Sequence, residues 1–201
     1  MDELALLQVV RLKGRVRPAD LAATLDEDEV VVGAAVERFA EAGLLVQGKA
    51  VRLTPNGKDR LAELLVKERG RIDNQAIAAI YDDFRAVNRE FKALISDWQL
   101  RNGAPNDHTD ADHDAAVLGR LEGTHDTILP ILASASEQLP RLDAYSAKLS
   151  AALEKIRDGD ATWLTRPLVD SYHTVWFELH EELIGAAGLT REDEARAGHA
   201  E

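Results

Sequence analysis

Six residues with polar or aromatic side chains fall on the apolar arcs of predicted helices. When each helix is projected at 100° per residue, two histidines and two aromatic residues share one wide arc near the carboxyl terminus. A third histidine and an asparagine lie on the apolar stripes of two other helices. At least three helices therefore direct polar groups at one interior. The set comprises Asn88, His125, His173, Trp176, Phe177 and His180.

Two interpretations of this set are open. Buried polar groups are costly without partners, so these residues could bond to one another in a network that fixes helix packing. Alternatively, they could line a pocket between helices that binds a small polar or anionic molecule, or a metal. The spacing Glu122-x-x-His125 occurs in di-iron bundles, but such a site needs the motif twice plus two further glutamates. The arc of His173 and His180 contains no carboxylate, so we expect no metal there.

Other groups of titratable residues have simpler interpretations. Asp107-His108 and Asp112-His113-Asp114 are possible metal ligands, but they lie in or beside a polar loop and favour a solvated surface. The run 26–29 is acidic and suits the start of a helix, where carboxylates match the helix dipole. No phosphate-binding glycine loop, catalytic triad or HExxH motif is present. We therefore expect no catalytic residues, no cofactor and no enzymatic activity.

The charge is unevenly distributed along the 201 residues, whose net charge is −12. Residues 1–70 hold 11 basic and 12 acidic side chains, whereas residues 71–201 hold 13 and 24. No apolar run approaches the ~20 residues that span a bilayer, and the acidic start is unlike a signal peptide. Cysteine is absent, which fits a reducing compartment. We expect a cytoplasmic protein with no membrane association.

The chain is predicted to be mainly α and to form two domains and a tail. Residues 1–70 predict a winged helix-turn-helix domain, in which three helices precede a short hairpin around Gln47-Gly48-Lys49. Thr54 and Pro55 are suited to begin a further helix. Residues 71–189 predict an antiparallel bundle of about four helices for sensing and dimerisation. Pro130 predicts a kink or break, and the charged tail 190–201 is expected to be frayed or disordered.

Two stretches of the chain resemble known proteins. The phrase from Glu41 to Val46, followed by Thr54-Pro55-Asn56-Gly57, resembles winged-helix regulators of the MarR and ArsR types over about the first third of the chain. This resemblance implies a winged fold, which serves in DNA binding and also in protein interaction. Residues 170–183 are similar to helical segments of actinobacterial proteins that accompany phosphoenolpyruvate-using phosphotransferases. That similarity implies a protein partner of this kind.

The predicted recognition helix is poorly suited to DNA. Four carboxylates precede it, and its outer face offers Glu37 and a single cation, Arg38. Because neutralising phosphates supplies much of the binding energy, we expect DNA binding to be weak. The candidate DNA-contacting residues are Arg15, Arg17, Arg38, Lys49, Arg52, Lys58 and Arg60.

Fold precedent narrowly favours a ligand-responsive, homodimeric transcriptional regulator that senses a small molecule through its helical domain. The alternative is a non-catalytic accessory or interaction subunit with little or no DNA binding. In that case the winged helix would dock on a partner protein such as a phosphoenolpyruvate-using phosphotransferase.

Overall fold

The chain divides into two compact units, residues 1–72 and 73–201, in the computed structural model, which describes the backbone of residues 1–196. The division lies two residues beyond the predicted domain boundary. Both units are built mainly from helices, as expected. Among the described residues, no helix combines the length and the apolar character needed to cross a membrane.

The first unit has the order of elements of a winged helix. Its elements are α1 (Glu3–Lys13), α2 (Pro18–Leu25), α3 (Glu29–Glu41), β1 (Leu45–Val46), β2 (Arg52–Leu53) and α4 (Pro55–Arg69). β1 and β2 pair as the expected antiparallel hairpin. An isolated antiparallel bridge between Val16 and Val51, which the sequence did not predict, attaches the α1–α2 connection to the end of this hairpin.

Local signals explain where these elements begin. The carboxylate of Asp28 caps α3 and accepts hydrogen bonds from the backbone N–H groups of Val30 and Val31, at 2.8 and 3.3 Å. The hydroxyl of Thr54 caps α4 through the N–H of Gly57. An ideal Cβ on Gly57 would lie 2.0 Å from the carbonyl oxygen of Leu44, so only glycine permits this approach.

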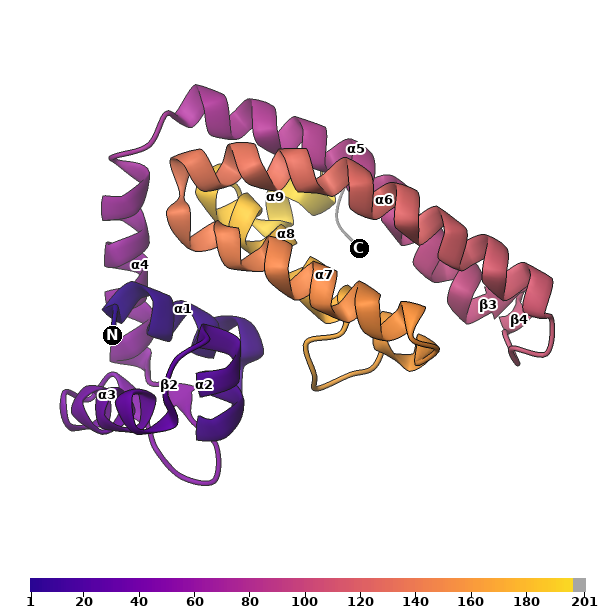
Figure 1. Ribbon diagram of the computed structural model, residues 1–201. Coiled ribbons are helices and arrows are strands. Elements are labelled where there is room, and N and C mark those ends of the chain that lie inside the picture. Colours follow the sequence, from indigo (N-terminus) through magenta and orange to yellow (C-terminus); the bar gives the residue numbers. More distant parts are fainter. Residues whose placement is uncertain (197–201) are drawn as a thin grey trace. The chain divides into compact units, whose positions relative to one another are not determined.

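The second unit is an antiparallel helical bundle. Its main helices are α5 (Asn74–Gln99), α6 (Ala111–Gln138), α7 (Asp143–Arg157) and α8 (Tyr172–Ala186). Each of these helices contacts the next, and α8 contacts α5, so the bundle is closed. Figure 1 shows α5 and α6 side by side along most of their length. Short 3₁₀ helices, η1 (Pro140–Leu142) and η2 (Ala161–Leu164), precede and follow α7.

Three features of this unit add to or differ from the expectations. α6 continues through Pro130, so of the predicted kink or break the break does not occur. The loop after α5 begins as a small hairpin, β3 (Leu100–Arg101) with β4 (Ala104–Pro105), and the turn residues Asn102 and Gly103 both have positive φ. The expected frayed tail instead contains helix α9 (Arg191–Arg196), and only its residues 197–201 lie outside the described part.

Candidate functional site

The interface between α5 and α8 brings together several of the residues predicted to form a pocket. The indole Nε1 of Trp176 donates to the side-chain oxygen of Asn88 at 2.8 Å, and both side chains are buried. Phe91 stacks on the same indole, with ring centroids 4.3 Å apart. Phe84 also stacks on it, with ring centroids 5.5 Å apart. The side-chain oxygen of Asn88 therefore has a partner across the interface, and aromatic rings pack against that partner.

His125 belongs to the adjoining contact among α6, α7 and α8. Its Nδ1 lies 3.2 Å from the hydroxyl of Tyr172, and its Nε2 lies 3.4 Å from the hydroxyl of Ser150. Burial is the main reason that the pKa of His125 lies below its usual value, and the charge of Arg157 lowers it further. The imidazole is therefore held in its neutral form between two hydroxyl groups.

The two histidines of α8 contact α5 at different positions along its axis. The Nε2 of His180 lies 3.2 Å from the Tyr81 hydroxyl. His173 lies against Phe91, with ring centroids 6.2 Å apart, and burial lowers its pKa. Phe177 departs from the predicted set, because its side chain is 42 % exposed. The set is thus divided between two helix contacts, and the side chain of Phe177 is partly exposed to solvent.

Hydrogen bonding among the members of this set fits the network interpretation. Asn88, Trp176, His125 and His180 each have a side-chain partner on another helix. Aromatic stacking occupies the space between α5 and α8, from Tyr81 and Phe84 to Phe91. A ligand pocket at these residues remains a prediction.

Two carboxylates of α8 are buried, contrary to the sequence projection, which placed them on its polar side. Glu178 and Glu182 are 3 % and 4 % exposed. An oxygen of Glu182 lies 2.6 Å from a guanidinium nitrogen of Arg141, and the other accepts a hydrogen bond from Tyr145 at 3.4 Å. The expectation of no inward carboxylate on this helix was therefore wrong. The burial of Glu182 depends on a cation that is distant in the sequence. The spacing of residues within one helix cannot reveal such a partner.

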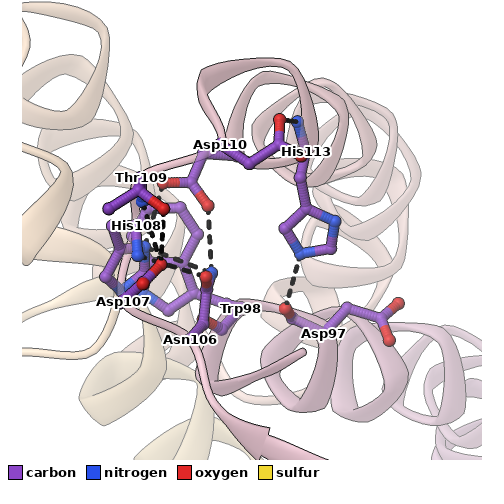
Figure 2. A network of polar contacts seen from close by, with 9 residues as sticks. Asp97, Trp98, Asn106, Asp107, His108, Thr109, Asp110 and His113 are labelled. Carbon is purple, nitrogen blue, oxygen red and sulfur yellow. Dashed lines mark hydrogen bonds and ion pairs between the residues drawn. The ribbon is translucent and has the colours of Figure 1, made fainter. Parts of the chain in front are cut away.

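The loop between β4 and α6 is organised by its own polar side chains (Figure 2). The Nδ1 of His108 lies 2.9 Å from a carboxylate oxygen of Asp114, and its ring lies 4.4 Å from that of Trp98. Asn106 donates to the other Asp114 oxygen at 3.0 Å. The Nε2 of His113 donates to the backbone oxygen of Asp97 at 3.0 Å.

The candidate metal ligands of this loop therefore take part in hydrogen bonds that hold the loop against the ends of α5 and α6. Asp107 likewise accepts hydrogen bonds from the N–H and hydroxyl of Thr109. In the part of the chain that the structure describes, no group of three or more His, Asp or Glu side chains is arranged to hold a metal ion.

In the winged-helix unit, the Val16–Val51 bridge positions two of the candidate DNA-contacting arginines. Arg15 precedes Val16 and Arg52 follows Val51, so the bridge brings the backbone of the two arginines close together. Both arginines are exposed, as is Lys49 in the loop of the hairpin. We call these three residues the wing cluster.

The remaining candidate cations differ in availability. Arg60 is held by both carboxylate oxygens of Glu3, at 2.9 and 3.0 Å, and also contacts Glu63. Arg17 forms a bidentate ion pair with Asp20, with nitrogen–oxygen distances of 2.6 and 2.7 Å. Arg38 is exposed over the ring of Phe39, and Lys58 is exposed on the first turn of α4.

Apart from Arg38, the outer face of α3 is apolar and acidic. Val30 and Val31 are 79 % and 46 % exposed, and Ala34 and Glu37 are also exposed. This face lacks the Asn, Gln, Ser and Thr side chains that commonly read base edges. The exposed carboxylates of residues 26–29 lie at its leading end.

Comparison of the chain with protein-family models, with curated proteins and with solved structures finds no match. The winged-helix unit is cationic at the wing cluster and acidic at the start of α3. Of the features described, this asymmetry bears most directly on function.

Proposed function

We propose that this protein is a winged-helix transcriptional regulator that contacts DNA chiefly through the wing cluster. The observation that carries the proposal is that the Val16–Val51 bridge brings the exposed residues Arg15 and Arg52 close together. Guanidinium groups near one another repel. A phosphate that contacts both reduces that repulsion and accepts charge-assisted hydrogen bonds from them.

Charge counting sets the expected strength of this contact. Arg17 and Arg60 are engaged with carboxylates of their own unit, and the acidic start of α3 opposes approach to phosphates. Three phosphate contacts per protomer correspond to a slope of log K against log salt concentration of about −3, or about −5 for a symmetric dimer. We therefore expect weak binding that is measurable at low salt and lost near physiological salt.

The proposal is tested by fluorescence anisotropy with the DNA upstream of the protein's own gene, at about 50 and 200 mM salt. The double variant Arg15→Ala/Arg52→Ala should lower the low-salt affinity by about tenfold or more and flatten the salt slope. Lys67→Ala serves as a control, because this exposed cation lies 12 residues beyond Pro55, about 18 Å along α4. Unchanged binding by the double variant would refute a role for the wing.

A second candidate function is a non-catalytic protein-interaction subunit, and the exposed valines of α3 favour it. An apolar strip with an acidic end is better suited to a protein partner than to a phosphate backbone. Wild-type protein that binds no DNA at low salt, but co-purifies with a defined partner, would support this candidate. In that case Val30→Ser/Val31→Ser should abolish the association, whereas Arg15→Ala/Arg52→Ala should preserve it.

A further inference from the structure

A buried ion pair joins α9 to α5 in the helical unit. Glu194 is only 3 % exposed, although it belongs to a helix of six residues. Its Oε2 lies 3.7 Å from the Nε of Arg85. Both atoms are buried, and neither has a hydrogen-bond partner among the described residues. Buried charged atoms normally have close partners, so this pair is incompletely satisfied.

Arg85 is held in place independently of α9. One terminal nitrogen donates to the carboxylate of Asp82 at 3.1 Å. The guanidinium carbon lies 5.7 Å from the centre of the Tyr81 ring. The Nε that faces Glu194 is thus a donor that helix α5 itself fixes in position.

Tyr81 lies beside this pair and also contacts His180. The hydroxyl of Tyr81 and the Nε2 of His180 are 3.2 Å apart and link α5 to α8. Burial and then the neighbouring Glu194 carboxylate raise the pKa of Tyr81, which stays a neutral phenol. The place that Glu194 occupies is therefore lined by a guanidinium group and a phenol of α5, and the imidazole of His180 on α8 contacts that phenol.

We infer that Arg85 and Tyr81 form a binding site for a small monocarboxylate, with His180 in contact with the Tyr81 hydroxyl, and that the Glu194 carboxylate occupies this site as an internal substitute. A free carboxylate is not tethered to a helix, so it can approach Arg85 Nε more closely than 3.7 Å and form the missing hydrogen bond. Its binding displaces Glu194. Helices as short as α9 are not stable without packing contacts, so displacement would also release α9 from the bundle.

This inference goes beyond the proposed regulator function, because it depends on the helical unit alone. A failure to bind DNA would leave it intact. If the regulator function is correct, carboxylate binding and the release of α9 supply the response to a ligand.

The first experiment replaces Glu194 in the full chain and uses acetate as the probe. Glu194→Ala leaves a gap of carboxylate size, so its Tm should fall. Acetate should raise the Tm of this variant by about 2 °C or more above the Tm measured in sodium chloride at equal concentration. In Glu194→Gln the amide fills the gap, so acetate should add nothing. Glu192→Ala is the matched control, because that carboxylate is 87 % exposed on the same helix.

The site residues are tested in the Glu194→Ala background. Adding Arg85→Met should remove the acetate effect, because the guanidinium group is the main anchor for the anion. An equal acetate effect in all these variants would indicate a general salt effect and overturn the inference. So would an unchanged Tm in Glu194→Ala, or rescue that persists without Arg85.

The second experiment tests exchange in the wild-type chain. Helix α9 begins and ends with arginine, so trypsin reports on its release. Acetate should accelerate cleavage there at least about twofold relative to sodium chloride, because cleavage follows the open population when reclosing is fast. Acetate could raise the Tm of Glu194→Ala and yet leave the rate of trypsin cleavage of the wild type unchanged. That result would show that the ion pair is purely structural and would overturn the proposed exchange of Glu194 for a free carboxylate.

Discussion

His125 shows how burial sets the state of a single side chain. Both ring nitrogens lie near hydroxyl groups, and the cationic form would have to be buried beside Arg157. The neighbouring carboxylates Glu122 and Asp126 oppose this effect but do not outweigh it. The residue is therefore suited to anchor helices in its neutral form, and lowering the pH works against it.

We expect stability to fall on acidification. The pKa values of His125 and His173 are lowered in the folded state, so the unfolded state binds protons first. The contribution of the two histidines to the free energy of unfolding is complete above their unfolded-state pKa of about 6.5. It is lost as the pH falls through their pKa values in the folded state. The free energy of unfolding should change by at most about 1.4 kcal/mol per pH unit for each group. Urea denaturation of the wild type between about pH 5.5 and 7.5 measures it.

The variant His125→Gln isolates one of these groups. It removes the titration but keeps a side chain that can bond to Tyr172, so its stability should depend less on pH. His113→Gln is the control, because His113 lies at the loop and donates to a backbone oxygen. A pH slope that is the same in His125→Gln and in the wild type would contradict the neutral-anchor interpretation.

At the scale of elements, helix α8 is packed on more than one side. It contacts both α5 and α7, so Trp176 faces one neighbour while Glu182 faces another. A helix in this position has little room for a solvated polar face. The Glu182 carboxylate is consequently paired with Arg141 and Tyr145 from the segment that precedes α8 in the bundle.

Removal of the Glu182 carboxylate should destabilise the helical unit strongly. Glu182→Ala leaves the guanidinium group of Arg141, which is only 16 % exposed, without this partner. Loss of one member of a buried pair typically costs about 3–5 kcal/mol. Glu137→Ala, at an exposed position of α6, should change stability by less than about 0.5 kcal/mol. Chemical denaturation measures both, and equal losses would show that Glu182 is not an anchor.

At the scale of the whole molecule, the two units differ in charge as well as in fold. Residues 1–72 carry 12 basic and 12 acidic side chains, so the entire net charge of −12 falls on residues 73–201. Each unit has its own buried core, with Leu61 in the first and Leu149 in the second. These are the properties of two separate folding units.

Calorimetry should therefore resolve two unfolding transitions in the full chain. Leu61→Ala should lower one transition, and Leu149→Ala should lower the other, because truncating a buried leucine typically costs about 2–5 kcal/mol. The two substitutions are matched, since Leu61 and Leu149 are 2 % and 0 % exposed. A single transition lowered by both substitutions would show that the units unfold together.

Much of the element order was predictable because its signals are local. Apolar periodicity, the capping residues Asp28 and Thr54, and the glycine of the hairpin act within a few residues. The hairpin at Asn102 was missed, although Asn-Gly is a strong signal for a two-residue turn. The hydrophobic pattern likewise placed Asn88 and His125 inside the protein, as observed.

The sequence alone determined which segments are helical, because those choices depend on neighbours along the chain. Only the tertiary structure decided which polar groups are paired. Arg60 meets Glu3 across 57 positions, and Arg85 meets Glu194 across more than a hundred. Such contacts arise when distant helices pack together. For the same reason helix periodicity alone could not tell that Phe177 would be exposed and Glu178 buried.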